Sequence, residues 1–368
     1  MLAWVRGAPA EVIGGTMDSM NAGCAPSYAR PASRVTLSSA EPLRALTSGG
    51  CRRPILRTRP LASLYLTTLM LALSRRRFLG PPARAGIGLA LAAALVAPAR
   101  MAFATAPTVT VVRDVAYGAD PKQRFDVYIP RGVRNAPVVL MVHGGAWRTG
   151  DKRSRGVVGR KVERWSRAGI VVISVNYRML PGAEPVEQAR DVARALAAAQ
   201  ARLVEWGGDP GKVVLMGHSS GAHLVALLDA RPSLATSLGA RPWLGAVILD
   251  SAALDVVHTM TLPHLPLYTR AFGADHAFWR EASPQHHLAA GAKPLLIVCS
   301  SRRRDPCRAA NRFATKATSV GVRVEVLPLA KSHAAIDADL GAPGEYTRAV
   351  EAFMRTLDPV LARALDGR

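Results

Sequence analysis

The stretch from Val213 to Leu224 limits what this chain can fold into more than any other. Four apolar residues, which predict a buried strand, run directly into Gly217-His218-Ser219-Ser220-Gly221, and an alanine- and leucine-rich segment follows. A strand that turns at once into a helix forces its middle residue into a cramped backbone, and a Cβ at either glycine would collide with a neighbouring strand or helix. The pattern predicts that Ser219 presents its hydroxyl at the carboxyl edge of a sheet, although a turn without chemistry would share the motif.

Strands and helices are expected to alternate along the rest of the chain. Short β-branched and apolar runs predict strands, and apolar positions three and four residues apart predict amphipathic helices. The expected strands are an antiparallel pair at 108–117 and 123–129, then 137–142, 170–175, 213–216, 246–249, 294–298 and 322–329. The expected helices are 153–167, 184–206 closed by Gly207-Gly208-Asp209-Pro210, the segment after Ser219, 306–320 and a final helix at 346–365.

This alternation predicts the α/β class, with a mostly parallel sheet covered by helices on both faces. Ligands on such sheets bind beyond the carboxyl ends of the strands, where Ser219 is expected. The stretch from Ser251 to Lys293 carries proline, histidine and several large apolar residues. It predicts either a small cap or pocket wall, or an ordinary covering of the sheet.

A nucleophilic serine needs a base within hydrogen-bond reach and an acid that orients the base. His333 follows the strand at 322–329 and is the expected base, because the loop that carries it leaves the sheet at the same edge as Ser219. Asp305 is the only carboxylate directly after the strand at 294–298, which favours it as the acid. Asp250, after the preceding strand, is the main alternative, and Asp305 could also simply cap the helix that starts at Pro306.

Backbone N–H groups suit an oxyanion because they need no reorganisation when the charge develops. His143-Gly144-Gly145-Ala146-Trp147 follows a strand that is expected to be buried, and its two glycines let the main chain approach a substrate. The N–H groups of Gly144, Gly145 and Ser220 are therefore the expected donors.

With these motifs the chain resembles the α/β-hydrolase esterases. The resemblance is to the branch shared by small-acyl carboxylesterases, hormone-sensitive-lipase-like esterases and kynurenine formamidases. The resemblance covers about residues 110–360 and implies a triad of Ser219, Asp305 and His333. The motifs that carry it are His143–Trp147 with Gly150-Asp151-Lys152, Asn176-Tyr177-Arg178, Gly207–Pro210 and Gly217–His223. Ala146-Trp147 in place of a third glycine is closer to the formamidase and feruloyl-esterase-like branch. Arg302-Arg303-Arg304 stand where the family usually has small and acidic residues.

The first 106 residues differ in composition from the rest. They hold 13 basic and 3 acidic residues, so 10 of the 22 net positive charges precede residue 107. Ser74-Arg75-Arg76-Arg77-Phe78-Leu79, the 15 uncharged residues 85–99 and Ala102-Phe103-Ala104 are typical of a bacterial twin-arginine export signal. We therefore expect export machinery as a partner and a periplasmic or secreted mature chain, with a retained N-terminal membrane helix as the alternative.

Three segments are predicted: residues 1–69, residues 70–106 as the leader, and residues 107–368 as the catalytic domain. The arginine pair of such leaders normally lies close to the start, and Met70 lies four residues before Ser74. Residues 1–69 are Arg-, Pro- and Ser-rich without sustained periodicity, which predicts disorder or an over-extended reading frame with translation starting near Met70.

Cys299 and Cys307 are the cysteines of the expected mature chain, and pairing or two separate thiols both remain open. No CxxC pair and no His-x-x-x-His spacing indicates a metal, and no cofactor is expected. The arginines are scattered without interleaved aromatics, so the charge indicates a solvated surface rather than nucleic-acid binding.

The sequence therefore predicts a serine hydrolase that cleaves small or medium carboxylic esters through an acyl-enzyme. Two alternatives stay open: a kynurenine-formamidase-type amidohydrolase, and a non-catalytic binding protein on a hydrolase scaffold. The oligomeric state and the acyl and alcohol groups are not predicted.

Overall fold

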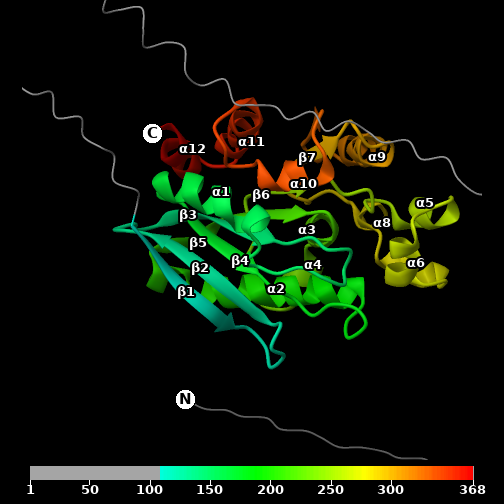
Figure 1. The fold of residues 1–368 in the computed structure, drawn as a ribbon, viewed down its shortest axis with the longest axis horizontal. Coiled ribbons are helices and arrows are strands. Elements are labelled where there is room, and N and C mark those ends of the chain that lie inside the picture. Colours follow the sequence, from blue (N-terminus) through cyan, green and yellow to red (C-terminus); the bar gives the residue numbers. More distant parts are fainter. Residues whose placement is uncertain (1–107, 368) are drawn as a thin grey trace, which may run out of the picture. The chain divides into compact units, whose positions relative to one another are not determined.

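A computed structural model describes residues 108–367 of the chain. Its centre is an eight-stranded sheet with the order β1-β2-β4-β3-β5-β6-β7-β8 (Figure 1). The strands are β1 (Val109–Ala116), β2 (Arg124–Pro130), β3 (Ala136–Val142), β4 (Val171–Val175), β5 (Gly208–His218), β6 (Gly245–Leu249), β7 (Leu295–Ser300) and β8 (Val324–Leu329). The pairs β1–β2 and β2–β4 are antiparallel and the other pairs are parallel, which confirms the predicted α/β class and mostly parallel sheet.

The central strands are buried on both faces because helices cover each side. In β3, for example, Val138, Leu140 and Val142 pack into one core, while Val139 and Met141 pack into the other. Side chains of a strand alternate between faces, so a strand between two helical layers must be apolar at every position. All seven residues of β3 are buried.

The helices divide between the two faces of the sheet. Apolar residues of α2, α3, α4 and α9 belong to the first core, and those of α1, α10, α11 and α12 belong to the second. Their bounds are α1 (Arg155–Arg167), α2 (Pro185–Arg202), α3 (Ser220–Ala230), α4 (Ser233–Thr236), α9 (Asp305–Ser319), α10 (His333–Ala338), α11 (Glu345–Arg355) and α12 (Pro359–Asp366).

The segment between β6 and β7 folds into four short helices on the right-hand side of Figure 1. They are α5 (Val256–Thr261), α6 (Pro266–Phe272), α7 (His276–Glu281) and α8 (Pro284–His287). Phe272 and Trp279 are buried in the first core, whereas Leu262 and Leu265 are about half exposed. The segment is thus both a covering of the sheet and, at α5 and α6, a pocket wall.

Three predictions about the elements are wrong. The expected helix at 346–365 is two helices, because Pro359 cannot continue α11 and Asp358 caps α12 by accepting a hydrogen bond from the Val360 N–H. The segment after β8 is a helix, α10, rather than a loop, since Ser332 caps it through the Ala335 N–H. Finally, Gly208–Pro210 belong to β5, while Gly207 alone, at φ 72°, closes the preceding 3₁₀ turn.

The predicted leader and the boundary at residue 107 lie outside the described residues. Within residues 108–367, no helix combines the length and apolar character that a membrane span requires.

Asp229 in α3 is fully buried, and its Oδ1 accepts a hydrogen bond from Trp243 Nε1 at 2.7 Å. Burial raises the pKa of Asp229 to about 7, and the hydrogen bond from Trp243 only partly offsets this. Because the folded state then binds this proton more tightly than the unfolded state, stability should fall as the pH rises from about 4 to about 7. We expect Asp229→Asn, which keeps one oxygen acceptor, to favour the folded state more at pH 8 than at pH 5, by about 3 kcal/mol.

Thermal unfolding of the Asp229→Asn variant and the wild type at pH 5 and pH 8 tests this. The gain in melting temperature should be several degrees at pH 8 and should shrink at pH 5. Exposed Glu205→Gln is the control and should show no such pH dependence. An equal effect of Asp229→Asn at both pH values would contradict the expectation.

Candidate active site

Ser219 lies at the turn between β5 and α3, as predicted. Its φ of 56° is in the left-handed region, which is strained for a residue with a side chain. A Cβ at Gly217 would collide with the backbone of Gly221, and a Cβ at Gly221 would collide with the backbone of Val142 and His143. The two glycines therefore permit the close packing of strand and helix that holds the Ser219 hydroxyl in place.

His333 contacts Ser219 although it lies 114 positions later in the chain. It is the first residue of α10, four positions after the end of β8. Ser219 Oγ lies 2.9 Å from His333 Nε2, and the imidazole is 37 % exposed. Ser219 can therefore donate its hydroxyl proton to Nε2, as the prediction of this pair requires.

The acid beside the imidazole is Asp250, so the prediction of Asp305 is wrong. His333 Nδ1 lies 2.6 Å from Asp250 Oδ2 and donates to it. Asp250 is the residue directly after β6, and its side chain is fully buried. Asp305 is instead the exposed first residue of α9, on the far side of Arg302–Arg304. The loop after β7 passes the imidazole with Arg303, so Asp305 occupies the first turn of the helix.

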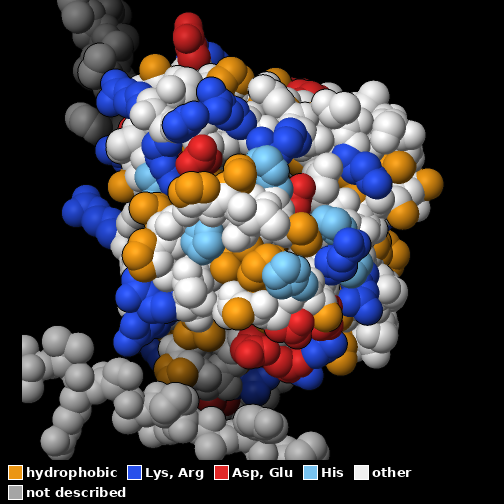
Figure 2. Space-filling model, turned by 90° about the vertical axis from the view of Figure 1, so that its right-hand side faces the viewer, with side chains coloured by type: hydrophobic (Ala, Val, Ile, Leu, Met, Phe, Trp, Pro, Cys, Tyr) orange, Lys and Arg blue, Asp and Glu red, His pale blue; other side chains and the backbone are white. Residues whose placement is uncertain are grey.

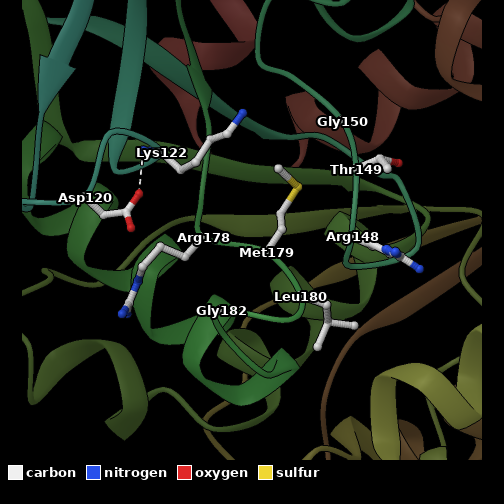
Figure 3. Close-up of a pocket in the computed structure, with 9 residues that line it drawn as sticks. All are labelled: Asp120, Lys122, Arg148, Thr149, Gly150, Arg178, Met179, Leu180 and Gly182. Carbon is white, nitrogen blue, oxygen red and sulfur yellow. Dashed lines mark hydrogen bonds between the residues drawn. The ribbon is translucent and has the colours of Figure 1, made fainter.

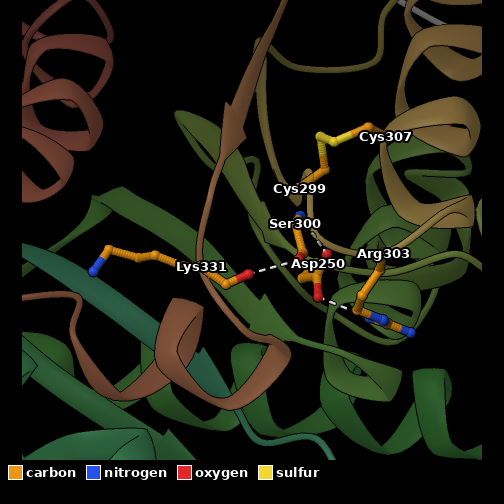
Figure 4. Close-up of a disulfide and its surroundings, with 6 residues drawn as sticks. All are labelled: Asp250, Cys299, Ser300, Arg303, Cys307 and Lys331. Carbon is orange, nitrogen blue, oxygen red and sulfur yellow. Dashed lines mark hydrogen bonds and ion pairs between the residues drawn. A yellow bond between two sulfur atoms is a disulfide. The ribbon is translucent and has the colours of Figure 1, made fainter.

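Asp250 is held ionised by three donors. Burial alone would raise the pKa of Asp250, but the hydrogen bonds from His333, the Ser300 N–H and Arg303 outweigh it and lower this pKa. The Ser300 N–H lies 2.7 Å from Oδ1, and Arg303 Nη1 lies 2.7 Å from Oδ2 (Figure 4). A permanent carboxylate keeps the proton of His333 on Nδ1, so Nε2 is free to accept.

The loop that surrounds Asp250 is closed by a disulfide. Cys299 at the end of β7 is bonded to Cys307 in α9, and Figure 4 shows this bond beside Ser300 and Arg303. The Ser300 hydroxyl donates to the Lys331 carbonyl at 2.6 Å, which ties β7 to the segment that carries His333. Of the two alternatives left open by the sequence, the structure has the paired cysteines.

Gly144 and Ser220 lie on either side of Ser219. A Cβ at Gly144 would stand 2.8 Å from Ser219 Cβ, so only a glycine brings the main chain this close to the nucleophile. Ser220 is the first residue of α3, and the first N–H groups of a helix have no partner within the helix. Gly145 has a φ of 133°, and a Cβ there would collide with the backbone of Thr149. The structure thus brings Gly144 and Ser220 next to Ser219, and the N–H of Gly145 stays a predicted donor.

Trp147 anchors the loop after β3 in the core, a role that the sequence did not indicate. Trp147 is buried, and its Nε1 donates to His223 Nδ1 at 3.2 Å. His223 Nε2 in turn donates to the Ala282 carbonyl at 2.7 Å. Burial lowers the pKa of His223 to about 4, so it stays neutral and can accept from Trp147.

His218 supports the imidazole of His333 in a similar way. Its Nε2 donates to the His333 carbonyl at 3.0 Å, and the two rings lie 4.5 Å apart. Burial lowers the pKa of His218 to about 4. Asp337, which is paired with the buried Lys161 at 2.7 Å, lies 3.6 Å from His218 Nδ1. This buried ion pair leaves no pattern in the sequence, because its residues are 176 positions apart.

Two hollows flank these residues. The first, of about 510 Å³, is lined by Arg148, Gly150, Arg178 and Leu180, with Lys122 and Met179 pointing into the same space in Figure 3. A Cβ at Gly150 would collide with the Gly144 carbonyl, so this hollow adjoins the oxyanion loop. The second, of about 690 Å³, lies between α5, α6 and α9 and includes Arg303 in its wall. It adjoins the acid side of the site.

In the part of the chain that the structure describes, no three His, Cys, Asp or Glu side chains gather as a metal site would require. The arrangement of Ser219, His333 and Asp250 can act chemically through the protein's own groups: a nucleophile, a base, an orienting acid and backbone donors.

Comparisons with known proteins show which families and folds this chain resembles. Residues 125–238 match the BD-FAE family. "Probable isoprenylcysteine alpha-carbonyl methylesterase ICME" from Oryza sativa subsp. japonica is 37 % identical over 117 residues, which cover 32 % of this chain and 28 % of that protein. "Esterase LipC" from Mycobacterium tuberculosis is 29 % identical over 205 residues, which cover 52 % of this chain and 50 % of that protein. The chain thus spans half or less of the length of these two relatives.

Among solved structures, esterase B from Lactobacillus rhamnosis superposes with a TM-score of 0.56 at 19 % identity, covering 69 % of this chain and 87 % of that one. At this identity the match bears on the fold alone. The chain therefore has the α/β fold of these esterases, and its residues 125–238 are similar to the BD-FAE family.

Proposed function

We propose that this chain is a serine hydrolase that cleaves carboxylic esters through an acyl-enzyme. The observation that carries the proposal is the continuous contact from Ser219 Oγ to His333 Nε2 at 2.9 Å and from His333 Nδ1 to Asp250 Oδ2 at 2.6 Å. The relatives named as esterases support it.

In the first half-reaction, Ser219 Oγ attacks the ester carbonyl carbon while its proton moves to His333 Nε2. The negative charge that develops on the carbonyl oxygen is stabilised by the N–H groups of Gly144, Gly145 and Ser220. The tetrahedral intermediate then breaks the bond to the alcohol oxygen, which takes the proton from His333. Ser219 is left acylated and the alcohol leaves.

In the second half-reaction, water takes the place of the alcohol. His333 removes a proton from the water as it attacks the acyl carbon, and the same donors hold the oxyanion. Collapse of this intermediate returns the proton to Ser219 Oγ and releases the carboxylic acid. Asp250 stays ionised throughout and stabilises the imidazolium that forms twice in each turnover.

A fluorophosphonate probe tests this proposal, since it bonds covalently to an activated serine. We expect stoichiometric labelling with the adduct on Ser219, located by mass spectrometry, and turnover of 4-nitrophenyl esters from acetate to octanoate. Absence of both labelling and ester turnover in folded protein would overturn the proposal and favour a binding protein. Faster turnover of N-formylkynurenine than of every ester would favour the amidohydrolase alternative.

A further inference from the structure

The second hollow, at the acid side of the site, is strongly basic. Its wall contains four arginines, Arg303, Arg304, Arg308 and Arg312, and one carboxylate, that of Asp305. Figure 2 looks onto the side of the molecule that carries α5, α6 and α9, and Lys and Arg side chains gather over its upper half. This hollow is therefore a place where an anion would be attracted.

Three of these arginines form a row on one face of α9. Arg304 directly precedes the helix, and Arg308 and Arg312 follow at intervals of four residues. Residues four apart lie on the same side of a helix, so the row extends over about 12 Å along the wall of the hollow. We call Arg304, Arg308 and Arg312 the arginine row.

The arginine row destabilises the helix that carries it. Like charges four residues apart repel, and cations near a helix N-terminus oppose the helix dipole. Within residues 108–367, no carboxylate lies within ion-pair distance of Arg304, Arg308 or Arg312. Arg312 Nε is moreover buried without a hydrogen-bond partner among these residues. No ion pair among the described residues stabilises this row, and its charge fits an anionic group that enters the hollow.

The opposite wall of the hollow is apolar. Leu262, Pro263, Leu265 and Tyr268 line it, and Leu262 and Leu265 are 49 % and 56 % exposed. Exposed leucines beside a row of arginines suit a molecule with a hydrocarbon part and a charged end.

The hollow reaches the reacting groups through Arg303. This residue lines the hollow and donates to Asp250 Oδ2 at 2.7 Å, while Asp250 holds His333. Because Arg303 is neutralised by Asp250, the arginine row is left to bind the ligand. A group bound in the hollow would therefore lie beside Arg303, on the acid side of Ser219 and His333.

We propose that the ester substrate carries an anionic oxyacid group, a carboxylate in its simplest form, that the arginine row binds while its hydrocarbon part lies against α5 and α6. This inference rests on the proposed ester hydrolysis and adds the substrate class. It assigns Arg308 and Arg312 to substrate selection rather than to the chemical step.

The test compares two esters of equal chain length, mono-(4-nitrophenyl) adipate and 4-nitrophenyl hexanoate, after subtraction of uncatalysed hydrolysis. We expect kcat/KM to be about tenfold or more higher for the adipate ester in low salt. The double variant Arg308→Gln/Arg312→Gln should lower this ratio by about tenfold, mainly through KM, and 0.5 M NaCl should lower it in the wild type. A second pair, 4-acetoxybenzoate and phenyl acetate, places the anion on the alcohol and shows which side of the ester enters the hollow.

Arg363→Gln is the matched control, since it removes an exposed arginine from α12, at the opposite side of the molecule from α5 and α6 in Figure 1. It should leave both ratios unchanged. Hydrolysis of the hexanoate ester with no preference for either anionic ester, or ratios that the double variant does not alter, would overturn the inference and leave ester hydrolysis standing. Failure to cleave any of the four esters would overturn the proposed function itself.

Discussion

Replacing Ser219 by alanine is expected to lower kcat/KM for 4-nitrophenyl esters by about 10⁴-fold or more. The remaining activity is what substrate binding and the backbone N–H donors supply without a nucleophile. The variant loses the atom that forms the acyl-enzyme, while Gly144, Gly145 and Ser220 keep their places. Because the side chain shrinks by one oxygen atom at a partly exposed position, the melting temperature should change by only a few degrees.

Steady-state kinetics and fluorophosphonate labelling measure the effect. Exposed Ser237→Ala is the control and should match the wild type in both. Activity that persists in Ser219→Ala, or a label that remains on another residue, would show that the nucleophile lies elsewhere.

The second large effect separates the two candidate acids. Asp250→Asn is expected to lower kcat by about 10³- to 10⁴-fold, because an amide can present its N–H₂ group to Nδ1 and stabilise the wrong tautomer of His333. Asp305→Asn should change kcat for the neutral hexanoate ester by less than about threefold, since Asp305 is exposed and the imidazole is bonded to Asp250.

The pair of variants also gives a stability test. Asp250 has a lowered pKa in the folded state, so its contribution to stability is present above the unfolded pKa and lost as the pH falls through the folded pKa. At pH 7, Asp250→Asn should therefore have an unfolding free energy about 1–3 kcal/mol below that of the wild type, and a lower melting temperature. Both differences should be smaller at pH 3. If Asp305→Asn instead of Asp250→Asn abolishes turnover, the assignment of the acid is wrong.

The acid shows where local patterns stop being informative. Both aspartates follow a strand of the same parallel sheet, and the choice between them depends on which loop closes over the imidazole. Asp250 comes directly after β6, whereas five positions separate Asp305 from the end of β7. That spacing could have favoured Asp250 over Asp305 as the acid. A short side chain directly after a strand is held more firmly than one that follows a longer loop, such as the loop with Arg302–Arg304. What the sequence could not show is that the disulfide and the Ser300 hydrogen bonds hold this loop so that Arg303, not Asp305, meets Asp250.

Sequence patterns alone determined the alternation of strands and helices, the parallel sheet, the turn at Ser219 and the pairing of Ser219 with His333. These follow from short-range rules: a buried strand must be apolar at each position, a tight turn needs glycine, and parallel strands end at one edge. Tertiary structure alone decided that Asp250 faces His333, that Cys299 and Cys307 are joined, and that Arg304, Arg308 and Arg312 line one hollow beside exposed leucines. The physical reason is that contacts between residues far apart in the chain depend on how loops pack, and loop packing is not periodic.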